Sequence, residues 1–282
     1  MISIDELKKI VQEVPPLPDI ALRLIRMCQD SSIAPREIVE VIKLDPAITI
    51  KVLRLCNSTF YGLPRRITSL QEALVYVGTD ALVNFVLAGC LAAMYQKENR
   101  GYGLDEGQLW RHAIGCAICA QQVALKVERN LAGIAFTAGL LHDIGKIIMN
   151  SFVAEEFQVL LDLVDREGIS FLDAERQVLG YTHAQAGAEI AEFWNLPDEL
   201  VHAIRYHHEP LSAKNYQKTV GLTHIGNILC ITLGIGIGSD GLASQFEEQV
   251  LESLGLTTEN LFELSIPIHD QYKKAEDLLS IA

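Results

Sequence analysis

The sequence predicts an all-α protein. Helix start and stop signals divide the chain into many short segments, and apolar residues recur at helical spacing, as in Leu7, Ile10 and Val11. No run of alternating apolar and polar residues is bounded by hairpin turns. With 282 residues, 49% of them hydrophobic, the chain is long enough to bury a substantial core.

Helix beginnings are indicated along the first hundred residues. Ser3 with Glu6, and Ser69 with Glu72, have the spacing of capping boxes. Asp45-Pro46 is typical of an N-cap followed by the first helical residue, because proline has a fixed φ that suits that position. These signals predict helices that begin near residues 4, 46 and 70.

Helix ends are indicated by glycines that follow apolar periodic segments, namely Gly78, Gly168, Gly180 and Gly255. The most apolar stretch, Ala81 to Tyr95, is shorter than the roughly 20 residues that span a membrane. We therefore expect a buried core helix there and no membrane segment. Cys116 and Cys119 lie inside an apolar helical run, which favours buried hydrophobic packing over a redox or metal role.

The net charge and the N-terminal segment argue against two classes of protein, those that bind nucleic acid and those that are secreted. The net charge of −13 argues against a nucleic-acid surface, which needs a basic stripe to neutralise phosphates. Residues 1–13 are charged and amphipathic, unlike a secretory signal. We expect a cytoplasmic protein with no nucleic-acid or membrane partner; its oligomeric state is left open.

Three regions are expected. Residues 1–100 form an N-terminal helical lobe, and residues 104–233 form a second helical lobe that holds nearly all the histidines. Residues 234–282 contain a glycine-rich loop followed by two or three amphipathic helices. The glycine cluster Gly234–Gly241 lacks a preceding strand, so a plain connector is favoured over a phosphate-binding loop.

The second lobe carries the candidate site. His142-Asp143 follows an apolar run, and a buried aspartate is costly unless it is paired, hydrogen-bonded or bound to a metal. One interpretation pairs Asp143 with Lys146 one turn on and packs His142 in the core. The alternative is a metal site, because side chains from several helices of a bundle can converge on an ion. The metal-ligand candidates are His112, His142, Asp143, His183, His207 and His208.

Imidazoles with one carboxylate suit iron, zinc, manganese or nickel, bound as one or two ions. The order of these residues resembles the HD superfamily of metal-dependent phosphohydrolases. The resemblance implies that Asp143 bridges two metals and that Lys146 contacts a phosphate, which would make them the catalytic residues. The last metal-ligand aspartate of the superfamily falls on Asn227, a poorer ligand. His224 is a further candidate ligand.

The N-terminal lobe carries the more specific resemblance. Val14-Pro-Pro-Leu-Pro18, Asp45-Pro46-Ala47, the segment Leu53–Gly62 and Ile67–Leu74 are similar to the signature of HDOD domains. Gly187–Pro197, followed by His207-His208-Glu-Pro210, is typical of the same family. The segment after His208 lacks the continuation found in HD-GYP phosphodiesterases. The resemblance implies a two-lobed helical fold in which the first lobe packs on an HD-like bundle.

HDOD proteins are signalling output modules, usually without demonstrated hydrolysis. The resemblance therefore implies a stand-alone regulatory module that contacts signalling proteins in trans and retains a metal site. The alternative is a metal-dependent phosphohydrolase or phosphodiesterase acting on a nucleotide or cyclic nucleotide, so a nucleotide is a candidate ligand. A third interpretation keeps the metal without catalysis, as a sensor of redox state or oxygen. The sequence leaves these alternatives open.

Overall fold

The computed structural model describes residues 4–30, 32–57, 65–241 and 247–275, and 76% of these residues are helical. Within these ranges no strand forms, and the backbone pair Asn99 and Leu104 makes an isolated bridge. The all-α prediction is confirmed. The segment 58–64 of the N-terminal motif, and Ser3 of the first capping box, lie outside the described residues.

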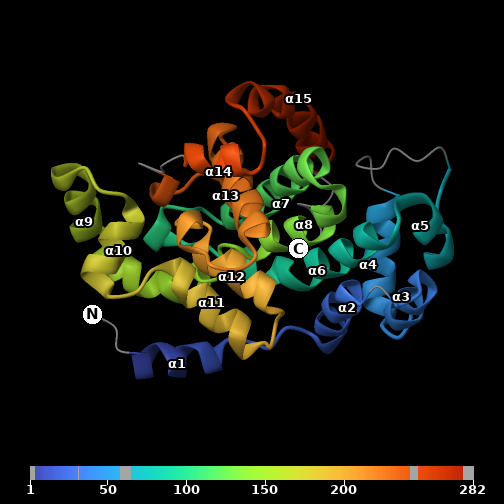
Figure 1. The fold of residues 1–282 in the computed structure, drawn as a ribbon. Coiled ribbons are helices and arrows are strands. Elements are labelled where there is room, and N and C mark those ends of the chain that lie inside the picture. The colour runs from blue at the N-terminus through green and yellow to red at the C-terminus, as the bar shows by residue number, and fades with distance from the viewer. Residues whose placement is uncertain (1–3, 31, 58–64, 242–246, 276–282) are drawn as a thin grey trace.

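The helices up to residue 95 precede the histidine-bearing lobe. They are α1 (Ile4–Glu13), α2 (Asp19–Gln29), α3 (Pro35–Ile42), α4 (Pro46–Cys56), α5 (Leu70–Val77) and α6 (Thr79–Tyr95). Helices α2 to α6 gather on one side of the molecule, whereas α1 lies apart from them and contacts α11 (Figure 1).

The histidine-bearing lobe follows. Its helices are α7 (Gln108–Val127), α8 (Ala132–Leu141), α9 (Lys146–Glu167), α10 (Phe171–Leu179), α11 (His183–Phe193), α12 (Asp198–Tyr206) and α13 (Gln217–Thr232). Short 3-10 turns lie at η1 (Arg100–Tyr102), η2 (Arg129–Leu131) and η3 (Pro210–Ser212). Helix α7 packs against both α8 and α13, so these three helices form the centre of the lobe.

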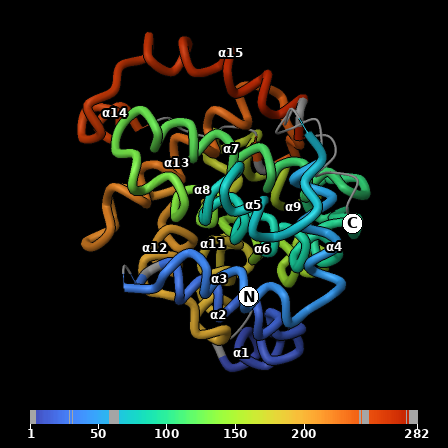
Figure 2. The backbone as a smooth tube through the Cα atoms, turned by 90° about the vertical axis from the view of Figure 1, so that its right-hand side faces the viewer, coloured from blue at the N-terminus to red at the C-terminus, as the bar shows by residue number. Residues whose placement is uncertain are grey.

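The chain ends in η4 (Ser239–Gly241), α14 (Glu248–Ser253) and α15 (Thr258–Lys274). Helix α14 packs on α13, and α15 runs along α7, on the outer edge of the molecule (Figure 2). A second apolar core forms beneath them and includes Leu229, Val250, Leu254 and Ile268. The main core is continuous from α1 to α12, so the two lobes share it.

The predicted helix boundaries are confirmed at both kinds of terminus. Asp45 accepts a hydrogen bond from the Ile48 amide at 3.0 Å, and Ser69 accepts one from the Glu72 amide at 3.2 Å. The four predicted glycines all have φ between 66° and 85°, the left-handed region where a side chain would be strained. Asn57 makes two hydrogen bonds that the sequence did not indicate. Its carboxamide accepts from the backbone amide of Ile67 and donates to the carbonyl of the same residue.

Helix α6 is the predicted core helix. Residues on every side of it are buried, including Leu82, Val86 and Leu91, as expected for a helix enclosed by others. The Tyr95 hydroxyl at its end donates to the carbonyl of Leu140 at 3.1 Å, which fastens α6 to the end of α8.

Within the described residues, one stretch has the length and apolar composition of a membrane span, and a bent helix pair would be a second if its two helices counted as one span. One is Arg129–Glu167, whose most apolar window is 78% buried inside the protein. The other is the pair α5 and α6, which bends by 117° between its helices. Burial of this extent is typical of core helices and fits a soluble protein.

Close helix packing depends on glycines. A Cβ atom at Gly139 of α8 would lie 2.8 Å from the Cα of Ala117 on α7, too close for the helices to keep their spacing. Gly89 of α6 is different, because the nearest atom to its Cβ position is a Lys51 side-chain carbon at 3.4 Å.

We expect Gly139→Ala to lower the free energy of unfolding by about 1–3 kcal/mol through overpacking. Gly89→Ala is the matched control and should raise it by up to about 1 kcal/mol, because alanine favours a helix. Urea denaturation of both variants measures the difference. Equal effects of the two changes would contradict the packing argument.

Candidate metal centre

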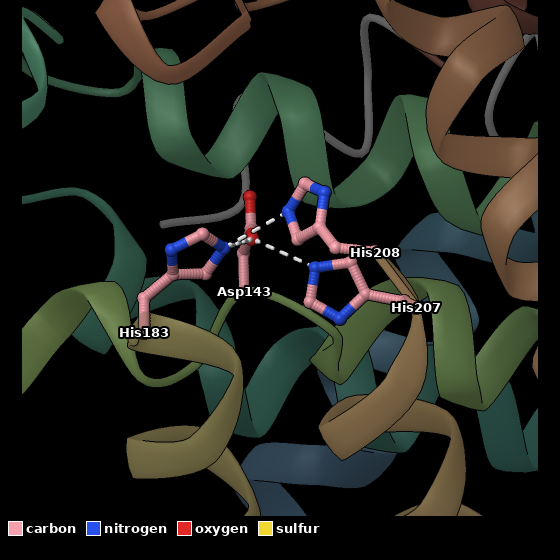
Figure 3. A group of neighbouring side chains, drawn as sticks. All are labelled: Asp143, His183, His207 and His208. Atoms are coloured by element: carbon pink, nitrogen blue, oxygen red, sulfur yellow. Dashed lines mark hydrogen bonds and ion pairs between the residues drawn. The ribbon is translucent and has the colours of Figure 1, made fainter. Parts of the chain in front are cut away.

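Helix ends bring the predicted ligands to one place. His142 caps the end of α8, His183 begins α11, and His207 and His208 follow the end of α12. His112 comes from the second turn of α7. Together they surround Asp143, which lies in the turn between α8 and α9 and is 1% exposed (Figure 3 shows four of these side chains).

The two carboxylate oxygens of Asp143 have different surroundings. Oδ2 lies 2.5 Å from Nζ of Lys146, 3.2 Å from Nε2 of His142 and 3.6 Å from Nε2 of His112. Oδ1 faces Nε2 of His183 at 3.5 Å and Nε2 of His207 at 3.7 Å, and it accepts no hydrogen bond. The predicted Asp143–Lys146 pair therefore forms, but it satisfies one oxygen only.

Gly145 allows this turn to approach α11. A Cβ atom there would collide with the carbonyl oxygen of His183 and would lie 2.5 Å from the amide nitrogen of Gly187. Gly187 is less restricted, since its Cβ position lies 2.9 Å from a side-chain carbon of Ile204 and 3.1 Å from the amide nitrogen of Gly145. The glycine after the H-D pair is thus required so that His183 can reach Asp143.

One hydrogen bond orients each buried imidazole. The Nδ1 atoms of His142, His207 and His112 lie 2.7, 2.7 and 3.1 Å from the carbonyl oxygens of Gly139, Ile204 and Ile235. A carbonyl oxygen only accepts, so Nδ1 carries the proton and, in the neutral ring, Nε2 presents a lone pair. These Nε2 atoms all point toward Asp143.

Glu175 is a site residue that the sequence analysis missed. It lies on α10, is fully buried, and its Oε2 accepts hydrogen bonds from Nδ1 and the amide of His183 at 2.8 and 3.0 Å. Its Oε1 accepts from the Tyr102 hydroxyl at 2.6 Å. A carboxylate behind a histidine fixes its tautomer and makes it a stronger metal ligand. In the sequence Glu175 is one of two acids in an amphipathic helical segment, and no motif distinguishes it from Asp173.

Burial and neighbouring charges shift the pKa values of the cluster's side chains in opposite directions. Burial lowers the pKa of His112 to about 4 and the pKa of His207 well below its usual range. Burial also acts on His183, but the Glu175 carboxylate outweighs it and raises the pKa of that ring. Burial opposes ionisation of Asp143, yet His142 and Lys146 hold its pKa well below the usual range. Burial acts on His142 too, but the Asp143 carboxylate outweighs it and raises the pKa of that ring to about 10. The centre thus combines an ionised carboxylate with neutral rings at His112 and His207, whereas a metal would have to displace the protons that His142 and His183 hold.

The ligand atoms form two groups that share Asp143. The first contains Asp143, His183, His207 and His208, and the second contains His112, His142 and Asp143; within each group the ligand atoms lie within 4.8 Å of one another. Two features fit a divalent ion. His142 Nε2, Asp143 Oδ1 and His207 Nε2 are buried without a hydrogen bond, and Nε2 of His183 faces Nε2 of His208 at 3.1 Å.

The two further candidates have supporting positions. His224 on α13 lies behind the cluster, where its Nδ1 bonds the backbone carbonyl of His207 at 2.8 Å. Asn227 contacts the cluster directly, because its Oδ1 lies 3.0 Å from Nε2 of His112. The glycine-rich segment also contributes, since Ile235 within it supplies the carbonyl that orients His112. Cys116 and Cys119 are fully buried, as their apolar run predicts.

Comparison with known proteins agrees with this architecture. A family model for the HDOD domain matches residues 14–210. An uncharacterized protein of Treponema pallidum (strain Nichols) is 26% identical over 222 residues, which are 77% of this chain and 42% of that protein. The chain thus spans less than half the length of this curated relative.

Two solved structures share the fold. A protein from Marinobacter aquaeolei VT8, provisionally designated a signal transduction protein, is 25% identical with a TM-score of 0.77 and covers 100% of this chain and 61% of its own. A protein from Shewanella amazonensis SB2B, provisionally designated a phosphohydrolase, is 24% identical with a TM-score of 0.73. The match covers 98% of this chain and 97% of that protein. With the matched model, the two lobes and the histidine order, these findings establish that the chain belongs to the HDOD domain family.

Proposed function

We propose that this chain is a cytoplasmic HDOD regulatory module whose histidine cluster holds one divalent metal ion tightly. The ion lies on the Oδ1 side of Asp143, among His183, His207 and His208. The observation that carries the proposal is Asp143 Oδ1 itself, a fully buried carboxylate oxygen that accepts no hydrogen bond while imidazole Nε2 atoms face it. Such an atom is costly to bury without a cation.

The Oδ2 side already has its cation, because the ammonium group of Lys146 lies 2.5 Å from Oδ2. On the same side, a neutral His112 has a lone pair on Nε2, which requires a donor from Asn227. Turning the carboxamide of Asn227 by 180° places its NH2 group there, since amide O and N are interchangeable in shape. Asn227 then covers a ligand atom that a second ion would need.

The charges agree with one ion. Asp143 supplies one negative charge directly, and Glu175 supplies a second through its hydrogen bond to His183. These two charges balance one divalent ion, whereas a second would bring two more positive charges beside Lys146. Three imidazoles and one carboxylate favour zinc, iron, manganese or nickel over calcium or magnesium.

Burial favours regulation over turnover. His142, Asp143, His183 and His207 are at most 1% exposed, and His208 is the one member of the first group with appreciable exposure. A substrate phosphate would have to enter past His208. An ion enclosed in this way orders the helix ends around it, and the surface they shape is the element that signalling partners would contact in trans. The signal-transduction designation of the Marinobacter relative supports the same class of function.

A metal-dependent phosphohydrolase is the second candidate. Lys146 beside Asp143 is the observation that favours it, since an ammonium group there would contact a phosphate, and the Shewanella relative is designated a phosphohydrolase. The metal would supply Lewis-acid activation. Asp143 would hold the ion, Lys146 would neutralise substrate charge, and a nucleotide or cyclic nucleotide would be the substrate.

Purified without chelator, the protein should carry about one equivalent of metal by mass spectrometry. His183→Ala and His207→Ala should each lower the affinity at least about tenfold, because each removes a ligand of the Oδ1 group. His112→Ala should keep most of the metal, and the exposed His269→Ala is the control. Loss in His112→Ala with retention in His207→Ala would overturn the assignment to Oδ1.

Asn227→Asp should raise the metal content of the loaded protein from about one to about two equivalents. The new carboxylate replaces a neutral amide beside His112 and offsets one of the two positive charges that a second ion brings. Isothermal titration with Zn²⁺ or Mn²⁺ counts the sites. Asn150→Asp is the matched control, since Asn150 bonds the Gly101 amide away from the histidines. A single site in Asn227→Asp would show that Asn227 does not limit the stoichiometry.

An activity assay distinguishes the two functions. It measures turnover of phosphomonoesters, dinucleotides and cyclic nucleotides by the metal-loaded protein. The regulatory proposal expects no turnover above that of Asp143→Ala. Turnover that is lost in Asp143→Ala and falls about a hundredfold or more in Lys146→Met would establish the hydrolase instead. Circular dichroism of both variants checks that the fold is retained.

A further inference from the structure

A cavity of about 290 Å³ lies between the two lobes, apart from the histidine cluster. The first lobe contributes residues of α2 and α6, and the second contributes η2, the first turns of α8 and a residue of α12. Its polar lining includes Cys28, Asp80, Asn84, Thr137 and Glu199. The volume is close to the lower end of small-molecule sites, about 300 Å³.

Asn84 is the residue that indicates a ligand. It is only 5% exposed and lines the cavity, yet its carboxamide makes no hydrogen bond to any other residue in the described part of the chain. Its polar atoms are not among the fully buried ones that lack a partner, so the carboxamide faces the open space of the cavity. A molecule in the cavity could therefore bond this amide without displacing any contact within the protein.

The charge of the lining defines the class of ligand. Asp80 and Glu199 carry carboxylates, and none of the described residues that line the cavity is lysine or arginine. The thiol of Cys28 does not alter this balance, because burial and the Asp80 carboxylate raise its pKa to about 11. The net charge of −13 also attracts cations at long range.

Asp80 is an exposed residue at the mouth of the cavity. A Cβ atom at Gly133 would lie 3.1 Å from the carboxyl carbon of Asp80, so this carboxylate fits against the first turn of α8. On the other side, Glu199 is held by a hydrogen bond from the Thr219 hydroxyl at 2.5 Å. Apolar side chains of Ile25, Val83 and Ile134 line the rest.

We propose that this cavity is a binding site for a small organic cation, an ammonium group on an apolar body. The ammonium group lies between the carboxylates of Asp80 and Glu199 and donates to the carbonyl oxygen of Asn84. The apolar body lies against Ile25, Val83 and Ile134. The ligand contacts both lobes, and its site shares no residue with the histidine cluster.

Titration calorimetry of the full chain in low-salt buffer tests the proposal with phenethylammonium and its neutral isostere 2-phenylethanol. The ammonium compound should bind with a dissociation constant of about 1 mM or below, and the alcohol at least about tenfold more weakly. Asp80→Asn should weaken ammonium binding at least about tenfold. Asp162→Asn, which removes an exposed carboxylate on α9, should leave it unchanged.

Asn84→Leu adds a second readout. It should abolish binding, because the amide oxygen that accepts from the ammonium group is replaced by an apolar side chain, and the ammonium compound should no longer raise the melting temperature of the variant. Equal binding of the alcohol and the ammonium compound, no binding of either, or unchanged binding in Asp80→Asn and Asn84→Leu would each overturn the proposal. Circular dichroism confirms that the variants are folded.

Discussion

The buried carboxylate of Asp143 is the constraint on which the second lobe depends. An ionised group with 1% exposure needs compensation from every side, and the chain supplies it from several helices that end or begin beside it. Lys146 satisfies one oxygen at 2.5 Å, and the imidazoles of His183 and His207 face the other. The glycines at 145 and 187 are a consequence, because they let the helices come close enough to deliver these groups.

The histidines are oriented by the ends of their own helices. His142 and His207 each place Nδ1 on the carbonyl three residues earlier, so the last turn of the helix determines which nitrogen is free. The direction in which each Nε2 atom points is therefore determined by the end of its own helix. The end of a helix depends mainly on nearby residues in the sequence. His183 and His112 differ, since their Nδ1 partners, Glu175 and Ile235, come from distant parts of the chain.

That difference explains how far the sequence could predict the site. The helical class, the caps at Asp45 and Ser69, and the gathering of the histidines around Asp143 follow from local signals and from the order of residues in a family motif. Glu175 and the carbonyl of Ile235 could not be predicted, because their roles arise only when α10 and the glycine-rich segment pack against the cluster. The contact of Asn227 with His112 is also tertiary; the sequence identified an amide in place of a carboxylate, but not the ring it would cover.

The cavity and the histidine cluster lie at opposite ends of the same two helices. Gly133 and Ile134 of α8, and Glu199 of α12, line the cavity, whereas α8 ends at His142 and α12 leads to His207 and His208. Helix α8 has 10 residues, or about 15 Å, so a displacement at its first turn reaches Asp143 through one rigid element. If a ligand of the cavity and a metal at the cluster both distinguish two positions of α8 or α12, each must change the affinity for the other by the same factor. Packed helices of this kind shift as units rather than deform, so α8 and α12 are the elements through which such a coupling would act.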